Sequence, residues 1–317
     1  MNMRPRVSVV MCAYNGIGLI EQAVDDILAQ SFTEWELVIS DDGSNDGTRD
    51  YLRQLGDSRI RILLQDRNLG YVANKNAAIA ATRGDLITQQ DQDDRSHPDR
   101  LARQVATLER SGLAIIGCGY RRLDTTGRVR ATSRLSRETI VTAYDPAVPY
   151  PFWFPALMVR REVFAQVGLF DEYFAGAFGD DLYWTAIANE QYPILCLPDH
   201  LYDYVESIGS ITSLAGSDRK LVIGEVLDTL LRQRRSTGTD DLQTGRIGTL
   251  EGRMLNDKRL LARNLQVYAV RAIDQRRWSE ARALIRRAFH SSPLRPSLAR
   301  AVLYYCRAFI RKSAANP

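Results

Sequence analysis

Three carboxylates crowd the end of one short apolar segment in this sequence. Leu86 and Ile87 have the pattern of a buried strand, and Asp91, Asp93 and Asp94 follow within a few residues. Like charges this close raise one another's pKa values, so they persist most readily where a divalent cation or a cationic partner neutralises them. Oxygen ligands favour Mg²⁺ or Mn²⁺, ions that usually share their coordination shell with a substrate diphosphate. The segment therefore points to a nucleotide that a metal ion bridges to the protein.

The same acids have a simpler explanation as a solvated turn. Charged side chains usually lie on protein surfaces, and an acidic turn here would precede a helix that Pro98 opens. The choice between the two depends on which other polar groups the fold brings to this turn.

Strand and helix patterns alternate through the first part of the chain. Such an alternation predicts a mostly parallel sheet with helices on both faces, and ligands bind beyond the carboxyl ends of its strands. Asn15, Asp42 and Asp91 all fall at those ends. The expected strands are 7–13, 36–40, 59–64 and 86–90, and the expected helices include residues 20–28, 51–55, 71–82 and 98–109.

The pattern changes near residue 220. Before this point, apolar runs predict further strands, and after it the apolar spacing becomes helical. We therefore expect one domain at 1–220 and a helical region at 221–317. The expected strands and short apolar segments are 113–123, 129–135, 152–159 and 194–205, and the expected helices are 221–235, 253–272, 278–289 and 296–312.

The net charge of +4 hides an asymmetry between these two parts. Residues 1–220 carry 23 Lys and Arg against 30 Asp and Glu, a net charge of −7, whereas residues 221–317 carry 19 against 8, a net charge of +11. An acidic first part argues against nucleic acid as its main ligand. The basic second part suggests an anionic surface or partner.

The cysteines and the apolar runs indicate the compartment. The four cysteines have no CxxC spacing, which indicates neither a zinc site nor a disulfide framework, so we expect a reducing cytoplasm. No apolar run approaches the ~20 residues of a membrane span, and the residues before the first strand are too few for a signal peptide. Any membrane contact is therefore expected to be peripheral, on the inner face of the cell membrane.

Four motifs in order resemble family 2 glycosyltransferases of the GT-A fold. They are VSVVMCAYN at 7–15, DDGSNDGT at 41–48, NLG at 68–70 with Asn76, and DQDD at 91–94. A fifth match is GLFDE at 168–172 followed by GDDLYW at 179–184, where the family usually has Glu-Asp instead of Asp-Asp. The resemblance covers about residues 5–215. It implies a GT-A catalytic domain at 1–220, with a Rossmann-like nucleotide-binding half, followed by a helical extension.

The resemblance also implies an activity. Members of this family transfer a sugar from a nucleotide-diphosphate donor to an acceptor hydroxyl, usually with inversion and with Mg²⁺ or Mn²⁺. The donor would be a UDP-, dTDP- or GDP-sugar. The acceptor would be a saccharide or a lipid-linked saccharide, in the synthesis of a bacterial surface polysaccharide or glycoconjugate.

Two other functions remain open at this point. One is a nucleotide-sugar-binding protein without catalysis. The other is a dinucleotide-dependent oxidoreductase, because Gly16 and Gly18 open a helix after a strand. The glycine fingerprint of such enzymes is incomplete, since Glu21 stands where a third small residue should allow close helix packing.

The matched motifs imply the donor-binding residues. Asp42 matches a carboxylate that accepts a hydrogen bond from the nucleotide base, and a turn cap is its alternative role. The loop of Ala13, Tyr14 and Asn15 is expected to approach the nucleotide through backbone groups, with the Tyr14 ring either near the base or in the core. Lys75 lies where relatives often have a basic residue on the nucleotide, and a solvated helix cation is its alternative.

The motifs also imply the metal ligands and the base. Asp93 is expected to bind the metal directly, and Asp91 to contact the ribose, the metal or a metal-bound water. Asp94 suits a charge at the start of a helix instead. The base that removes the acceptor proton corresponds to Asp181, with Asp180 as its rival, and a helix cap is the alternative role of this pair.

Two further expectations concern the acceptor site and the basic region. The aromatic run at 150–155 suits an acceptor sugar, with Trp153 as the candidate, and core packing is the other role of such residues. The region 221–317 suits docking to an anionic bilayer that carries a lipid-linked acceptor. Packing on the catalytic domain, or formation of a homodimer, would explain the same region equally well.

Overall fold

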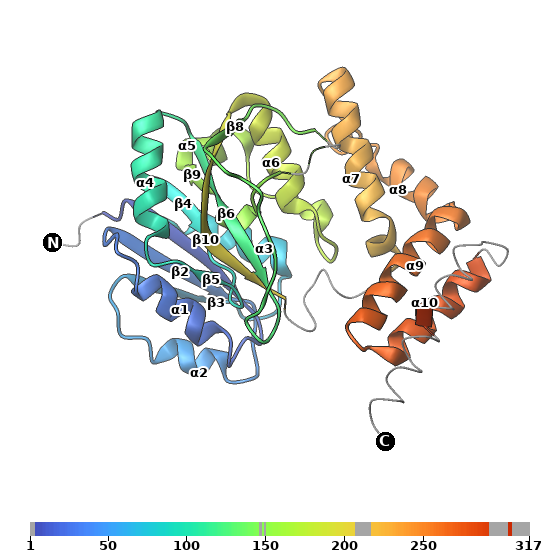
Figure 1. The fold of residues 1–317 in the computed structure, drawn as a ribbon, viewed down its shortest axis with the longest axis horizontal. Coiled ribbons are helices and arrows are strands. Elements are labelled where there is room, and N and C mark those ends of the chain that lie inside the picture. Colours follow the sequence, from blue (N-terminus) through green and yellow to red (C-terminus); the bar gives the residue numbers. More distant parts are fainter. Residues whose placement is uncertain (1–3, 146–147, 149, 207–216, 292–303, 306–317) are drawn as a thin grey trace. The chain divides into compact units, whose positions relative to one another are not determined.

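A parallel group of four strands forms the first part of a sheet in the computed structural model (Figure 1). The structure describes residues 4–145, 148, 150–206, 217–291 and 304–305. Strand β1 pairs in parallel with β2 and β4, and β2 pairs in parallel with β3. The four strands predicted for this part of the chain are thus confirmed. Their bounds are β1 Val7–Ala13, β2 Trp35–Asp41, β3 Ile60–Leu64 and β4 Leu86–Gln89.

The second part of the sheet is mixed. The described strands follow the order β3-β2-β1-β4-β9-β6-β10-β5, with β7 beside β6 and β8 beside β10. Strand β9 runs antiparallel to both β4 and β6, whereas β6 and β10 are parallel to each other. The bounds are β5 Arg95–Ser96, β6 Ile115–Leu123, β7 Val129–Thr132, β8 Thr139–Val141, β9 Met158–Arg160 and β10 Ile194–Val205.

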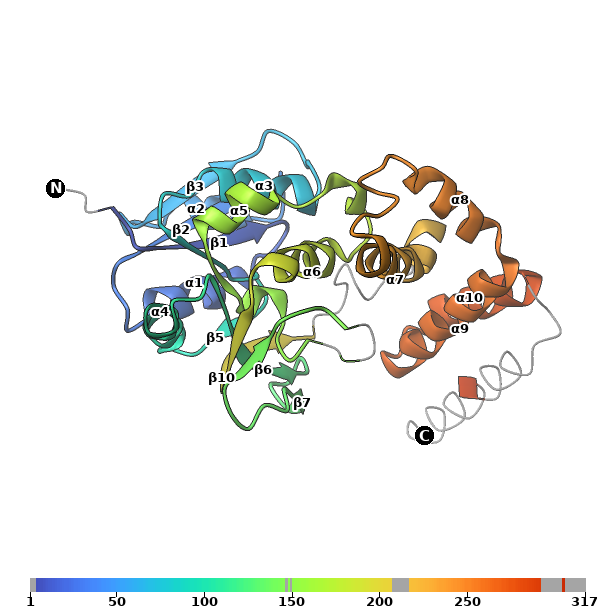
Figure 2. The same ribbon diagram turned by 90° about the horizontal axis from the view of Figure 1, so that it is seen from above.

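Helices cover both faces of this sheet, with α1 and α4 on one side and α3 and α5 on the other (Figure 2). Ile27 and Leu108 belong to one buried cluster, and Ile79 and Trp184 to the other. Because both faces are covered, β1 and β2 are buried at every position. The helices are α1 Ile20–Leu28, α2 Thr48–Arg53, α3 Tyr71–Ala80, α4 Arg100–Ser111, α5 Arg161–Val167 and α6 Asp180–Gln191, with short 3₁₀ turns at Phe154–Ala156 and Glu172–Phe174.

The strand register brings three loops to one edge of the sheet. Ala13 at the end of β1 pairs with Asp41 at the end of β2, and Val10 pairs with Gln89 at the end of β4. The segments that follow these strands therefore leave the sheet side by side. They carry Asn15, Asp42 and Asp91, as the motif spacing predicts.

The chain divides into two compact units. The first holds residues 1–176 and 180–207, and the second holds residues 177–179 and 208–317. The domain boundary expected near residue 220 stays a prediction. In the second unit, Tyr268, Ala269 and Leu284 share one buried cluster. Its described helices are α7 Asp218–Thr237, α8 Ile247–Asn256, α9 Lys258–Asp274 and α10 Trp278–Ser291.

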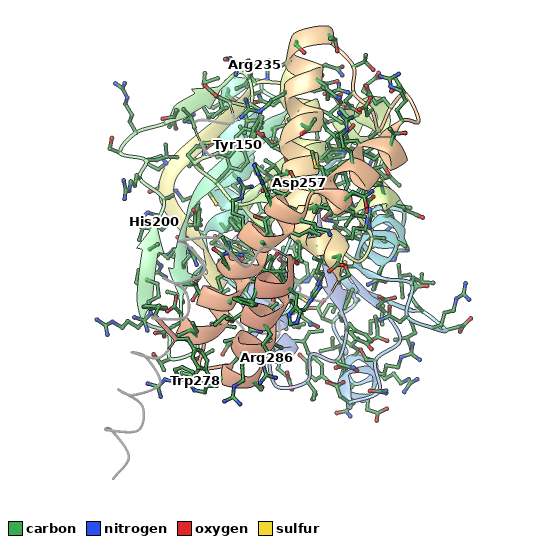
Figure 3. The ribbon with its side chains drawn as sticks, turned by 90° about the vertical axis from the view of Figure 1, so that its right-hand side faces the viewer. Tyr150, His200, Arg235, Asp257, Trp278 and Arg286 are labelled. Carbon is green, nitrogen blue, oxygen red and sulfur yellow. The ribbon has the colours of Figure 1, made fainter. Side chains whose placement is uncertain are left out.

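One helix predicted in the second unit, 253–272, is wrong because it forms two helices. The Asp257 side chain accepts hydrogen bonds from the backbone N–H groups of Arg259 and Leu260, which ends α8 and caps α9 (Figure 3). The helix predicted at 296–312 lies outside the described residues, apart from Tyr304 and Tyr305. No helix among the described residues is long and apolar enough to cross a membrane.

Candidate active site

The acidic segment forms a turn directly after β4. Strand β4 ends at Gln89, and the Asp94 N–H donates to the Asp91 carbonyl at 3.2 Å. The Asp91 N–H donates to the Tyr202 hydroxyl on β10, also at 3.2 Å. The acids therefore lie on a turn whose ends are fixed by two strands, and strand alternation does not decide which way they point.

Asp94 has a structural role in this turn. One of its carboxylate oxygens accepts a hydrogen bond from the Tyr202 hydroxyl, and the other accepts one from the Val205 N–H, both at 2.8 Å. Asp94 is buried, and burial together with the charges of Asp91 and Asp93 raises its pKa well above the usual range. The expectation of a helix-terminal charge is wrong, because Asp94 joins the turn to β10 instead.

Asp91 and Asp93 are the two acids of the turn that remain as candidates for a ligand. Burial and the charge of Asp93 raise the pKa of Asp91 to about 7, against the hydrogen bond that Gln89 donates to its carboxylate. The described residues contain no group of three or more His, Cys, Asp or Glu arranged to hold a metal ion. Two repelling carboxylates fit a hard cation that takes its remaining oxygen ligands from a diphosphate and water.

Because Asp91 is buried beside the charge of Asp93, we expect Asp91→Asn to stabilise the metal-free protein. A carboxyl whose pKa rises from 3.8 to about 7 on folding binds more protons in the folded than in the unfolded state between those pH values. Its contribution to the free energy of unfolding therefore falls as the pH rises through that window and stays low above it. We expect Asp91→Asn to raise the free energy of unfolding at pH 8 by about 2 kcal/mol, allowing for partial solvent exposure.

Thermal unfolding in EDTA at pH 8 and at pH 4 would measure this effect. The stabilisation should be present at pH 8 and nearly absent at pH 4, where the wild-type carboxyl is also neutral. Asp66→Asn, at an exposed acid, is the matched control and should change little at either pH. A variant that is less stable than the wild type at both pH values would contradict the prediction.

The loop after β1 is joined to the turn after β2 by hydrogen bonds. The Asn15 N–H donates to the Ser44 hydroxyl at 2.8 Å, and the Asn15 side-chain oxygen accepts from the Asn45 N–H at 2.9 Å. Asn15 has a positive φ of 45°, a conformation that asparagine tolerates better than most residues. The Ala13 carbonyl accepts from the Asp42 N–H at 2.8 Å. These bonds fix the course of the predicted nucleotide loop.

The side chain of Gln92 binds the same loop from the acidic turn. Its oxygen accepts from the Tyr14 N–H at 3.1 Å, and its nitrogen donates to the Tyr14 carbonyl at 3.2 Å. Gln92 lies so close to Gly16 that a Cβ atom there would be 2.1 Å from its side-chain oxygen. Tyr14 is 47% exposed, which excludes the core position.

Asp42 lies under the loop that precedes α3. Its two carboxylate oxygens accept hydrogen bonds from the backbone N–H groups of Leu69 and Gly70, at 2.6 and 3.0 Å. Asp42 thus acts as an anchor for that loop, while each oxygen keeps a lone pair for a further donor. The neighbouring Asp41 has a different partner, since it pairs with Arg49 at 2.6 Å.

Lys75 is a buried cation and not the solvated helix cation that was its alternative. Its side chain is 1% exposed and forms an ion pair with Asp180. The ammonium also lies 3.8 Å from the centre of the Phe170 ring and 4.6 Å from that of Tyr71. Lys75 therefore connects α3 to the first residue of α6.

Asp181 is the second residue of α6, next to Asp180. Burial and the charge of Asp180 raise the pKa of Asp181 to about 6, although Lys75 acts in the opposite direction. One Asp181 oxygen accepts from the Leu182 N–H at 2.7 Å. The charge of Asp181 in turn raises the pKa of Asp91, so the two carboxyls share one electrostatic environment. A carboxyl with a pKa near 6 is suited to accept a proton close to neutral pH.

Trp153 lies in a group of partly exposed aromatic side chains. Its ring centre is 5.1 Å from that of Tyr204 and 6.0 Å from that of Tyr120. Tyr204 is two residues after Tyr202, which binds the acidic turn. The next residue after Trp153, Phe154, faces Lys75 at 5.3 Å. The neighbours of Trp153 and Tyr204 in the chain thus contact the acidic turn and Lys75.

Several residues of the site had no individual signal in the sequence. Gln92 is the middle residue of a quoted motif, and only its geometry shows that it holds Tyr14. Arg100 is fully buried and donates to the carbonyls of Gln89 and Pro155, at 3.0 and 3.2 Å. Its position inside an amphipathic helix pattern gave no indication of this contact.

Solved structures show the fold class. Residues 1–349 of S. aureus TarS, in complex with UDP-GlcNAc, align over 96% of this chain and 81% of that chain, with a TM-score of 0.56 and 15% identity. The mannosyltransferase PcManGT from Pyrobaculum calidifontis, in complex with GDP-Man and Mn²⁺, aligns over 97% and 81%, with a TM-score of 0.52 and 18% identity. The α/β fold predicted from the resemblance, of GT-A type with C-terminal helices, is confirmed.

The family follows from the sequence match. The family model described as Glycosyl transferase family 2 matches residues 8–168, about half of the chain. This chain belongs to that family. Membership of a glycosyltransferase family argues against the alternative function of a dinucleotide-dependent oxidoreductase.

Curated relatives match over part of their length. EpsE of Bacillus subtilis (strain 168), named as a glycosyltransferase, is 37% identical over 131 residues, which are 40% of this chain and 47% of EpsE. TuaG of the same strain, named as a teichuronic acid biosynthesis glycosyltransferase, is 36% identical over 121 residues, 38% of this chain and 48% of TuaG. ExoO of Rhizobium meliloti (strain 1021), a succinoglycan biosynthesis protein, is 38% identical over 111 residues, 35% and 32% of the two chains. The chain thus spans half or less of these relatives.

Proposed function

We propose that this protein transfers a sugar from a nucleotide-diphosphate donor to an acceptor hydroxyl, with inversion at the anomeric carbon and with Mg²⁺ or Mn²⁺. Its place would be in the synthesis of a bacterial surface polysaccharide or glycoconjugate. TuaG, named for teichuronic acid biosynthesis, and ExoO, named for succinoglycan biosynthesis, support this setting. The similar solved structures in complex with UDP-GlcNAc or GDP-Man support a nucleotide-sugar donor.

In this proposal Asp181 is the base. Its carboxylate accepts the proton of the acceptor hydroxyl while the hydroxyl oxygen attacks the anomeric carbon from the side opposite the diphosphate. The bond between the anomeric carbon and the diphosphate oxygen breaks, and the nucleoside diphosphate leaves with the electron pair. Asp180 is held by Lys75, which favours Asp181 over its rival for this role.

The donor would lie over the loops after β1 and β2. Ala13, Tyr14 and Asn15 are assigned to the nucleotide, with the exposed Tyr14 ring beside the base and Asp42 beneath it. Asp93, with Asp91 as the second acid, would hold the metal ion. When bound there, the ion neutralises charge on the diphosphate and so makes it a better leaving group.

A single observation carries this proposal. Asp91 lies beside Asp93 on a turn at the carboxyl edge of the sheet, and its pKa is raised chiefly by burial and by Asp93, with a further contribution from Asp181, which comes from a distant part of the chain. The acid pair proposed to hold the metal and the candidate base, whose pKa is raised to about 6, thus lie in one electrostatic environment. A turn that served only as a solvated cap would need neither.

Release of nucleoside diphosphate from a panel of UDP-, dTDP- and GDP-sugars, with and without Mn²⁺ or Mg²⁺, would test the proposal. Metal-dependent release from at least one donor, together with a product of inverted anomeric configuration, is the expected result. Tight donor binding without turnover would support the remaining alternative, a nucleotide-sugar-binding protein without catalysis. No binding of any donor would overturn both.

Trp153 is the proposed acceptor contact. Sugars stack on aromatic faces, and Trp153 with Tyr204 offers a partly exposed pair of aromatic rings. The acceptor class that fits best is a saccharide, free or linked to a lipid.

For residues 221–317 we propose peripheral contact with an anionic bilayer that carries the acceptor. Arg259, Arg271 and Arg286 are exposed on the helices of this region, and Phe289, on the same helix as Arg286, is 55% exposed. Each arginine near a charged surface contributes about 1 kcal/mol. Replacing all three by glutamine should therefore weaken binding to vesicles that contain phosphatidylserine by about 100-fold.

Flotation with such vesicles measures this effect, and uncharged vesicles give the background. The matched control replaces Arg128, Arg134 and Arg137, which are exposed in the first unit, by glutamine. If both triple variants float as the wild type does, the membrane proposal fails. Homodimer formation through the same region would then be examined by light scattering.

A further inference from the structure

Lys75 has surroundings that are unusual for a residue that binds a donor. It is 1% exposed, and its ammonium forms an ion pair with Asp180. Three aromatic rings surround it, with their centres 3.8 Å away for Phe170, 4.6 Å for Tyr71 and 5.3 Å for Phe154. A lysine with this packing has little freedom to reach a diphosphate.

Neighbouring hydrogen bonds hold the rings in place. Asn76, the residue directly after Lys75, binds both backbone groups of Phe170: its oxygen accepts from the Phe170 N–H at 3.0 Å and its nitrogen donates to the carbonyl at 2.8 Å. The Tyr71 hydroxyl accepts from the Gln89 side chain at 2.8 Å. Gln89 also donates to Asp91. The surroundings of Lys75 are thus continuous with the acidic turn.

We propose that Lys75 is a positioning residue for the base: it holds Asp180, and with it the first turn of α6 that carries Asp181, and it does not bind the donor diphosphate. This rests on the proposed function, in which Asp181 is the base. Moving Lys75 toward a donor would leave Asp180, a buried carboxylate, without its partner, and breaking a buried ion pair in this way is strongly unfavourable.

The test uses Lys75→Met, Asp180→Asn and the double variant in the full chain. UDP and GDP with Mn²⁺ serve as binding probes, measured by calorimetry, and thermal unfolding measures the coupling of the pair. We expect Lys75→Met to lower the melting temperature by roughly 10 °C and the double variant to recover most of that loss. The affinity for the probes should change by less than about threefold.

The kinetic arm separates a positioning role from a purely structural one. Burial raises the pKa of Asp181, as does Asp180 on the same helix, whereas Lys75 from α3 lowers it, and Asp91 from the acidic turn interacts with Asp181. Without the lysine charge, the acidic limb of the pH profile of kcat should move to higher pH. Loss of kcat by about 10- to 100-fold, with the donor KM unchanged, is expected.

Arg61→Met is the matched control, because Arg61 pairs with the buried Glu36 near the amino ends of β2 and β3, away from the site. It should lower the melting temperature without moving the pH profile. Tenfold or greater loss of affinity for UDP or GDP in Lys75→Met, with additive melting temperatures in the double variant, would overturn the proposal. The binding and unfolding measurements test this role of Lys75 even if the protein turns over no donor. An absence of turnover would count against the proposed function, not against the role of Lys75.

Discussion

Metal-stimulated release of nucleoside diphosphate is expected to fall about 10³-fold when Asp93 is replaced by alanine. The reason is that the acidic turn offers only two carboxylates to a cation, since Asp94 is occupied by Tyr202 and Val205. Loss of one of the two proposed protein ligands should remove most of the affinity for the ion. Titration of Mn²⁺ against donor turnover measures both the maximal rate and the metal concentration needed to reach half of it.

Asp94→Asn is the matched control for this variant. The amide keeps an acceptor for the Val205 N–H and a donor for the Tyr202 hydroxyl, and Asp94 is already biased toward its neutral form by burial. The Asp94→Asn variant should keep the wild-type response to Mn²⁺. If Asp93→Ala responded to the metal as the wild type does, the ion would have to bind elsewhere, and the acidic turn would not be the metal site.

Asp181→Asn is expected to bind donor normally and to lose transfer by about 10² to 10⁴. The amide has nearly the shape of the carboxyl but cannot accept the acceptor proton. The wild-type rate should fall as the pH drops through about 6, because the carboxyl then gains a proton and loses its function as a base. The residual rate of Asp181→Asn should not show this fall at low pH. Rapid-quench measurement of transfer across this pH range tests the loss of rate and its pH dependence, and calorimetry tests donor binding.

Glu172→Gln replaces an exposed acid a few residues earlier and serves as the control for charge alone. Near-normal transfer by Asp181→Asn would move the base to another group. Asp180 would be the first to examine, although its carboxylate is engaged by Lys75 in this structure.

The parallel half of the sheet could be predicted because its strands are buried on both faces. Continuous apolar runs such as Val7–Ala13 carry that signal without reference to distant contacts. The motif spacing also placed Asn15, Asp42 and Asp91 at one edge, which the register confirms. Their roles toward a donor remain predictions, since the contacts made within the chain do not determine what a ligand would touch.

What could not be predicted depends on contacts between distant segments. Strand β5 has two residues, and it forms only because β10 runs beside it. Asp94 resembles any acid before a helix until Tyr202 is placed next to it. Lys75 has the sequence neighbours of an exposed helical lysine, and its burial follows from Phe170 and Asp180, about a hundred residues away. Local propensity carries no information on such pairs.

The contact of Gln92 with Gly16 restricts how this protein can change through evolution. Any residue larger than glycine at position 16 would collide with the Gln92 side chain at 2.1 Å, and that side chain holds both backbone groups of Tyr14. Position 16 should therefore accept a larger residue only where the Gln92 side chain gives up its hold on Tyr14, and a small residue at 92 should permit a Cβ at 16. Selection from a library randomised at both sites would reveal such compensating combinations.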